Sequence, residues 1–127
     1  MSFIGGSIQV RGSEGQVYAG EVYIFHRITE PCRITEVVAS LGSQSAGTSV
    51  YFDVRKNGTA VTDSIFLGDG PIEITTSQSA VNNHFESSGV LDPARVVCAK
   101  GDELWIVISQ VGSTYSGSDS LVQIRTS

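Results

Sequence analysis

Apolar and polar residues alternate along many short segments of this chain, and in residues 100–113 both alternating faces are apolar. Glycines close this segment at both ends, and its β-branched residues favour a strand. The two faces consist of Leu104, Ile106 and Ile108, and of Trp105, Val107 and Val111. A strand with one face exposed to solvent would alternate apolar and polar residues. We therefore expect one face to pack on the core and the other on a second surface. The pattern leaves open which face does which.

The same alternation predicts strands along most of the chain. Residues 16–29 form a long candidate strand with Tyr23 and Phe25 on one face. Asn57-Gly58 lies between two apolar alternations and predicts a β-hairpin over residues 49–66, because both residues tolerate positive φ. The shorter candidate strands are residues 32–41, 72–74, 84–91, 96–99 and 121–125. The sequence contains no helical period of useful length.

These segments amount to about eight to ten strands, with turn signals roughly every eight to twelve residues. That spacing predicts an all-β protein and leaves a sandwich, a jelly roll and a small barrel open. Residues 16–127 form one predicted domain. Residues 1–15 are rich in glycine and serine and are predicted to be an N-terminal arm that can pair with a sheet edge, on this chain or a neighbour. The apolar residues of this arm are Phe3, Ile4, Ile8 and Val10.

The composition narrows the class of partner. The 127 residues carry 13 acidic and 8 basic side chains, for a net charge of -5. Nucleic acids and anionic membranes are bound by positively charged surfaces, so we expect neither as a partner. The first residues lack the basic start and apolar stretch of a secretory signal, and no segment reaches the length of a membrane span. The sequence therefore predicts synthesis in a cytoplasm without signal-directed export.

The residues that carry chemistry do not form a recognisable motif. His26 lies between apolar neighbours in a predicted strand, and His84 lies in a polar loop. Cys32 and Cys98 have no close-spaced partner of the kind that structural zinc sites use. They are predicted to be buried thiols, and a bridge between them would require their Cα atoms to lie within about 7 Å. We therefore predict no enzyme activity, no metal and no cofactor.

Four blocks of this sequence resemble a domain that recurs in virion proteins of tailed bacteriophages. They begin at Ile34 (Ile-Thr-Glu-Val-Val-Ala-Ser-Leu-Gly), at Val50 (Val-Tyr-Phe-Asp-Val-Arg-Lys-Asn-Gly-Thr), at Gly101 (Gly-Asp-Glu-Leu) and at Gln110 (Gln-Val-Gly-Ser-Thr, with Gly-Ser-Asp-Ser-Leu-Val-Gln-Ile following from residue 117). The resemblance covers about residues 33–126. It implies a jelly-roll-like antiparallel β-sandwich, commonly trimeric, in tail-tip, fibre and capsid-surface proteins. It carries no catalytic residues. Trp105 departs from the family pattern, which has a small polar residue after Gly-Asp-x-Leu.

The resemblance suggests two roles for the chain. Residues 1–127 begin with Met1, carry an arm before the domain and contain no shaft, which favours a capsid decoration (cement) protein on the virion surface. Its expected partners are two further copies, in a homotrimer, and the major capsid protein. The expected subunit contacts are Tyr23, Phe25, Trp105, Val107 and Val111, and the arm residues Phe3, Ile4, Ile8 and Val10 would contact the capsid. The alternative role is a receptor- or glycan-binding head module of a tail protein, with aromatic residues stacking on sugars. A free-standing enzyme has the least support.

Overall fold

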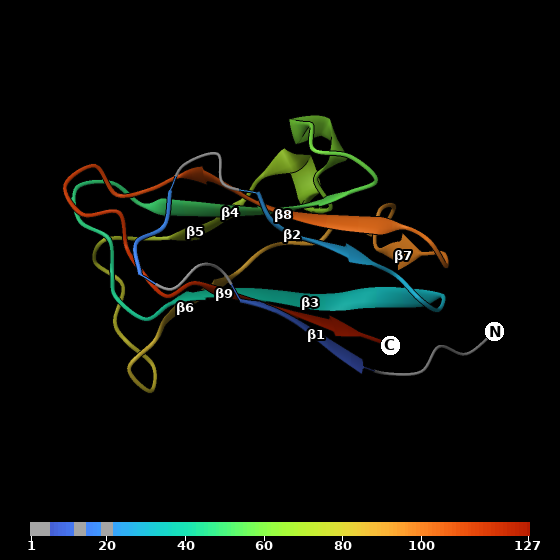
Figure 1. Cartoon of the computed structure of the whole chain (residues 1–127), viewed down its shortest axis with the longest axis horizontal. Coiled ribbons are helices and arrows are strands. Elements are labelled where there is room, and N and C mark those ends of the chain that lie inside the picture. Colours follow the sequence, from blue (N-terminus) through green and yellow to red (C-terminus); the bar gives the residue numbers. More distant parts are fainter. Residues whose placement is uncertain (1–5, 12–14, 19–21) are drawn as a thin grey trace.

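A computed structural model describes residues 6–11, 15–18 and 22–127, which form two antiparallel sheets packed face to face (Figure 1). The elements are β1 (Gly6–Arg11), β2 (Val22–Arg27), β3 (Cys32–Leu41), β4 (Val50–Lys56), η1 (Val61–Asp63), η2 (Leu67–Asp69), β5 (Ile72–Ile74), β6 (Phe85–Ser88), β7 (Val97–Cys98), β8 (Glu103–Gln110) and β9 (Leu121–Thr126). The element η1 is a single 3-10 turn, and η2 is a short 3-10 segment interrupted at Gly68, whose φ is +66°. The predicted all-β antiparallel sandwich is confirmed, and its jelly-roll character stays a prediction.

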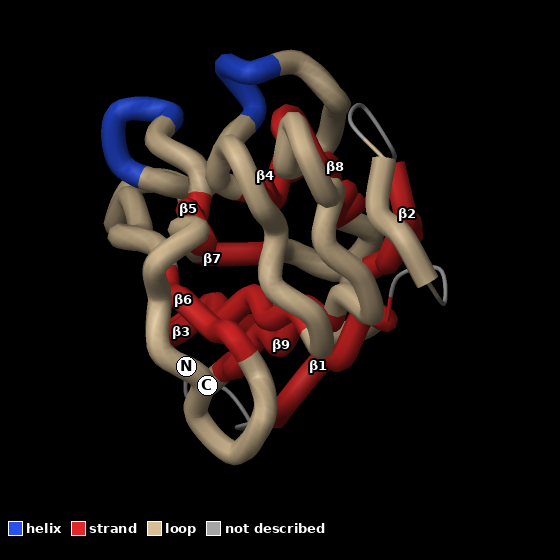
Figure 2. Tube along the Cα trace, turned by 90° about the vertical axis from the view of Figure 1, so that its left-hand side faces the viewer, coloured by secondary structure: helices blue, strands red, loops and turns tan. Residues whose placement is uncertain are grey.

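The strands are distributed between the two sheets out of chain order. One sheet has the order β1-β9-β3-β6, with β7 also paired to β3, and the other has the order β2-β8-β4-β5. In the end-on view of Figure 2, the second sheet lies above the first. Strands that follow each other along the chain therefore cross repeatedly between the layers, for example from β3 to β4 and from β8 to β9. The hydrophobic core fills the space between them.

The core is built from the inward row of each strand. Val37, Ala39 and Leu41 of β3 are fully buried, as the alternation of residues 32–41 predicts. The facing sheet contributes Val50, Phe52, Val54, Leu104, Ile106 and Ile108. This settles which face of β8 is inside. Leu104, Ile106 and Ile108 belong to the core, so Trp105 and Val107 lie on the outward face of the sheet.

The start of the chain contributes an edge strand to its own sandwich. β1 pairs with β9 over its whole length, from Gly6 opposite Thr126 to Arg11 opposite Leu121. Ile8 is half-buried and packs against the core. Within residues 1–15, the segment 6–11 thus contacts a sheet edge of the same chain. Phe3 and Ile4 lie outside the described residues.

The predicted hairpin over residues 49–66 is only partly right. β4 is followed by a turn at Asn57, whose φ is +60°, and the chain returns antiparallel, with a single bridge between Arg55 and Ser64. The returning segment is not a strand, because it begins with η1. Gly58 does not have a positive φ, but a Cβ atom there would meet the Asp63 carboxylate, so a larger residue would displace that side chain. Residues 57–66 thus form a loop that rises above the outer side of the four-stranded sheet (Figure 1).

Candidate interaction surfaces

The outward face of the four-stranded sheet carries a pair of aromatic rings. Phe25 of β2 lies directly opposite Trp105 of β8, with ring centroids 4.9 Å apart and planes tilted by 34°. Both side chains are half-buried. The guanidinium of Arg27 lies 5.3 Å from the centre of the Phe25 ring and 3.3 Å from a carboxylate oxygen of Glu103. We call Phe25, Arg27 and Trp105 the aromatic patch. It combines apolar area with a cation, a composition enriched at protein interfaces.

The aromatic patch lies at an edge of its sheet. Among the described strands, β2 pairs with β8 and forms one end of the order β2-β8-β4-β5. An edge strand presents backbone donors and acceptors along its free side, so it can extend a sheet into another chain. The patch and this edge are adjacent and could contact the same neighbour.

Part of this outward face is covered by the chain itself. Val107 lies directly opposite Asp53 of β4 and is only 6% exposed. Asp53 and Arg55 are also buried although they point away from the core, with 2% and 8% of their surface exposed. The loop of residues 57–66 accounts for this burial of the β4 side chains, because the backbone carbonyl of Thr59 accepts a hydrogen bond of 2.6 Å from Arg55 Nη1. The second apolar face of β8 is therefore only partly available to another molecule.

A buried polar network joins that loop to the sheet. Arg55 Nε donates to Asp53 Oδ2 at 2.7 Å, and the Ser64 hydroxyl donates to Asp53 Oδ1 at 2.6 Å. The backbone amide of Phe66 in turn donates to the Ser64 hydroxyl at 3.2 Å. Both carboxylate oxygens of Asp53 are thus satisfied, as a buried charge requires. This network was not predicted from the sequence. Its sequence signal is the pair of opposite charges, Asp53 and Arg55, in a strand whose other residues except Lys56 are apolar.

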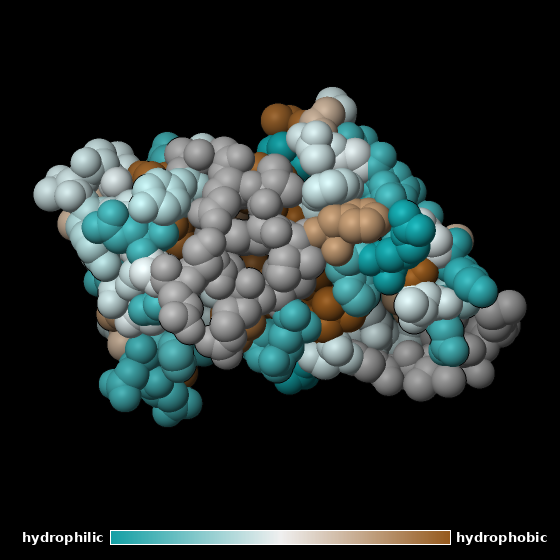
Figure 3. All heavy atoms as spheres, in the orientation of Figure 1, coloured by the Kyte–Doolittle hydropathy of each residue, from teal (hydrophilic) through white to brown (hydrophobic). Residues whose placement is uncertain are grey.

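A second surface is an apolar tip formed by three exposed side chains near η1 and η2. Val61, Leu67 and Val90 are 57%, 57% and 68% exposed. The Leu67 amide donates to the Val90 carbonyl at 2.8 Å, which brings two of these segments together. Arg95 fixes the loop by donating from Nη1 to the carbonyls of Thr62 and Ser64. In Figure 3, apolar atoms lie at the top of the view, where these loops lie, and elsewhere on this face they are scattered among hydrophilic atoms.

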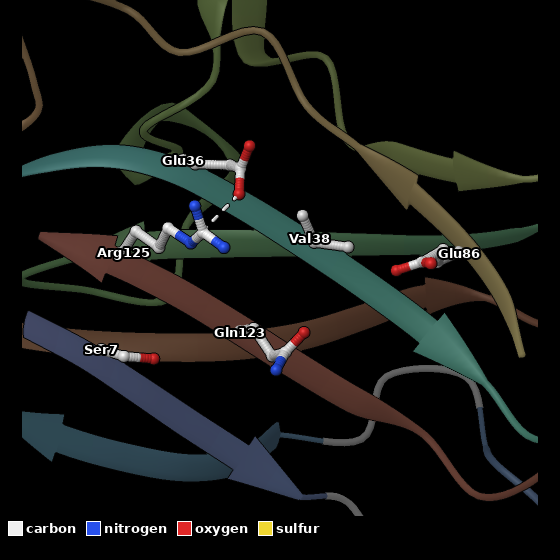
Figure 4. A pocket seen from close by; sticks show the side chains of 6 residues that line it. All are labelled: Ser7, Glu36, Val38, Glu86, Gln123 and Arg125. Carbon is white, nitrogen blue, oxygen red and sulfur yellow. Dashed lines mark ion pairs between the residues drawn. The ribbon is translucent and has the colours of Figure 1, made fainter. Parts of the chain in front are cut away.

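The outer face of the five-stranded sheet is polar in contrast. Figure 4 shows a hollow there, with side chains from β1, β3, β6 and β9 around it. Its lining consists of Ser7, Glu36, Val38, Glu86, Gln123 and Arg125. Arg125 and Glu36 form an exposed ion pair with 3.6 Å between nitrogen and oxygen. Exposed pairs of this kind contribute little to stability. The two outer faces of the sandwich therefore differ, with aromatic area on one and charges on the other.

The predicted subunit contacts are distributed unevenly in the structure. Phe25 and Trp105 lie together on the outward face, and Val107 beside them offers little surface. Tyr23 belongs to β2, but its side chain is outside the description. The prediction that Val111 shares the outward face is wrong, because its partly buried side chain packs against the core. β8 has a bulge where Phe52 pairs with Ile108 and Tyr51 with Gln110, so the extra residue reverses the alternation beyond it.

Of the predicted capsid contacts, Ile8 and Val10 belong to β1, opposite Ile124 and Val122. Ile8 is half-buried against the chain's own core, so only part of its side chain is available to another protein. The Val10 side chain, like Phe3 and Ile4, is outside the description. The structure thus places the described part of the arm at the edge of the five-stranded sheet, on the opposite layer from the aromatic patch.

Three observations concern other kinds of site. In residues 6–11, 15–18 and 22–127, no group of three His, Cys, Asp or Glu side chains is arranged to hold a metal ion. No helix in the described part of the chain is long and apolar enough to cross a membrane. Cys32 and Cys98 are buried, free thiols.

Comparison with known proteins adds no relative. No family model, no curated protein and no solved structure matches the chain.

Proposed function

We propose that this chain is a structural virion protein of a tailed bacteriophage, which assembles as a homotrimer through the aromatic patch and decorates the outside of the capsid. The four sequence blocks between residues 33 and 126 support the phage assignment, and the trimer follows from the same resemblance. The confirmed antiparallel sandwich is compatible with the fold that the resemblance implies. The protein would act by binding rather than by catalysis, cementing neighbouring capsid subunits together.

The observation that carries the proposal is the contact between Phe25 and Trp105 on the outward face of a sheet. Aromatic rings bury large apolar areas, and a tilted pair with centroids 4.9 Å apart leaves part of each ring for a neighbour. The rings lie beside β2, which is an end strand of its sheet among the described strands, so one neighbouring subunit could cover both the rings and this strand. In a cyclic trimer the same contact would recur three times.

The capsid contact is assigned to the segment that precedes β1. Gly6, the residue that follows this segment, pairs with Thr126 at the edge of the five-stranded sheet, in the layer opposite the aromatic patch. Phe3 and Ile4 are its large apolar residues. Subunit contact and capsid contact would thus use different layers of the sandwich. Three arms on one trimer would bind an icosahedral shell with the avidity that symmetry provides.

Binding to expanded phage heads tests this function. The heads should be assembled from the major capsid protein encoded nearest to this chain and sedimented with the purified protein. We expect the full chain to co-sediment, and a variant lacking residues 1–5 to stay in solution while keeping its thermal unfolding transition. Glu73→Ala, at an exposed position of β5 in the four-stranded sheet, serves as a control that should still bind.

A glycan array distinguishes the alternative role. The rings of the aromatic patch, with Arg27 and Glu103 beside them, could stack on a sugar in a tail-borne receptor-binding module. The decoration role predicts no glycan binding. Specific glycan binding that is lost in Trp105→Ala, together with failure to bind expanded heads, would replace the proposed function with the alternative.

A further inference from the structure

Cys32 and Cys98 are brought together by strands that are far apart in sequence. Cys32 begins β3 and Cys98 ends β7, and the two residues are direct partners in the antiparallel pair. The pairing continues with Arg33 opposite Val97, and the Ile34 amide donates to the Val96 carbonyl at 2.9 Å. Because side chains at directly opposite positions point to the same face, both thiols point inward, where they are 8% and 1% exposed.

The spacing of the two backbones suits a disulfide. Directly opposite residues of an antiparallel pair have Cα atoms about 4.5–5.5 Å apart. Disulfides bridge Cα separations of about 4.4–6.8 Å. Directly opposite residues of such a pair also have Cβ atoms about 4.5–5.5 Å apart on the same face, so a bond between the two sulfurs would span neighbouring side chains. β7 itself is held nearby by Lys56, whose Nζ donates to the Val97 carbonyl at 3.0 Å.

We propose that Cys32 and Cys98 are a latent redox site, a dithiol in a reducing medium that becomes a cross-strand disulfide in an oxidising one and then stabilises the sandwich. The bond would join β7 to β3 across a chain segment of more than half the protein, which restricts the unfolded ensemble strongly. The inference does not depend on the proposed function, because it follows from the pairing of β3 and β7 alone.

The reaction needs a low-molecular-weight disulfide such as oxidised glutathione as the oxidant. One cysteine thiolate attacks a glutathione sulfur, which forms a mixed disulfide and releases one glutathione. The other cysteine thiolate then attacks the mixed disulfide at the protein sulfur and releases the second glutathione. Two electrons pass from the cysteine pair to the oxidant, and the two thiol protons end on the two released glutathione molecules.

Burial controls when this reaction occurs. The pKa of the Cys98 thiol is raised to about 11, mainly by desolvation and to a lesser extent by the neighbouring Cys32. Desolvation also raises the pKa of Cys32. Thiolates are therefore rare in the folded protein near neutral pH, and a bulky oxidant cannot reach them. Bond formation is expected during folding or when β7 opens locally. For the same reason, the completed disulfide would be protected from reductants.

Refolding in a redox buffer tests the proposal without relying on access to the folded core. The full chain is unfolded and reduced, refolded at about pH 8 with excess oxidised glutathione, and treated with N-ethylmaleimide in denaturant. We expect a monomer that is lighter than the reduced chain by about 2 Da, for two lost hydrogens, with no maleimide attached. Its thermal midpoint should lie about 5 °C or more above that of the same sample after reduction.

Three outcomes would overturn the proposal. They are two maleimides on the refolded monomer, persistent glutathione adducts or disulfide-linked dimers, and an internal bond that leaves the thermal midpoint unchanged. Cys32→Ser and Cys98→Ser should each accept one maleimide or one glutathione and show no stabilising bond. If a serine variant does not fold, Cys98→Ala replaces it, and the wild-type measurement decides the question by itself.

Discussion

The carboxylate of Asp53 lies 2.7 Å from Nε of Arg55, two residues along β4, and both side chains are buried on the side of the sheet away from the core. A buried ion pair is tolerated only when its remaining hydrogen-bonding groups are satisfied. Here Ser64 and the Thr59 carbonyl supply those partners. The pair therefore fixes the loop of residues 57–66 over the sheet, and this explains why part of the outward face is closed to other molecules.

Removing the carboxylate should destabilise the fold strongly. Asp53→Ala leaves the buried Arg55 charge unpaired and the Ser64 hydroxyl without its acceptor, so the free energy of unfolding should fall by about 3–5 kcal/mol. Urea denaturation measures the loss. Glu36→Ala is the matched control, because it breaks an exposed ion pair with Arg125 and should cost less than about 1 kcal/mol. Equal losses for the two variants would show that the Asp53 network does not hold the loop.

Asn57 should be important for the junction between β4 and β8. Its Nδ2 donates to Asp102 Oδ1 at 3.2 Å, its Oδ1 accepts from the Glu103 amide at 2.8 Å, and its φ is +60°. Asn57→Ala loses both hydrogen bonds and adds backbone strain, so we expect a loss of about 2 kcal/mol in the free energy of unfolding. Asn57→Gly loses the hydrogen bonds but relaxes the backbone, and should cost less. If alanine were tolerated as well as glycine in thermal denaturation, the left-handed turn would be refuted.

Stability should decrease at alkaline pH because of the buried thiols. The pKa of Cys98 is raised from 9.0 to about 11, chiefly by burial, so between these values the folded state holds a proton that the unfolded state has lost. The contribution is fully present below pH 9 and is lost as the pH rises toward 11. The free energy of unfolding of the reduced protein should therefore fall over this window, and the fall should be shallower in Cys98→Ser. Parallel pH profiles for the two proteins would contradict the assignment.

The sequence predicted the inward rows of the sandwich well, because burial between two sheets imposes strict alternation. It failed where local geometry breaks that alternation. The bulge in β8 depends on pairing with β4, so the position of Val111 could not be read from β8 alone. The segment that follows Asn57 was predicted to be a strand because Ile65 and Phe66 are apolar, but these two residues reach the core from a loop.

The candidate site was predictable only in part. The two apolar faces of β8 indicated a second contact surface, and Trp105 lies on it. What covers the β4 side chains could not be identified from the sequence, since a loop of the same chain and a second subunit produce the same apolar pattern. Likewise, the separation of Cys32 and Cys98 by most of the chain concealed their pairing across β3 and β7.

The central claim is that the aromatic patch joins copies of this chain, and the mass in solution tests it most directly. Light scattering on the purified protein should report about three times the 13.5 kDa of one chain. Trp105→Glu places a carboxylate beside Arg27 and should give a folded monomer. Val38→Lys places a cation beside Glu36 and Glu86 on the other sheet and should stay trimeric. A wild-type protein that is monomeric at high concentration, or a Trp105→Glu variant with unchanged mass, would contradict the account.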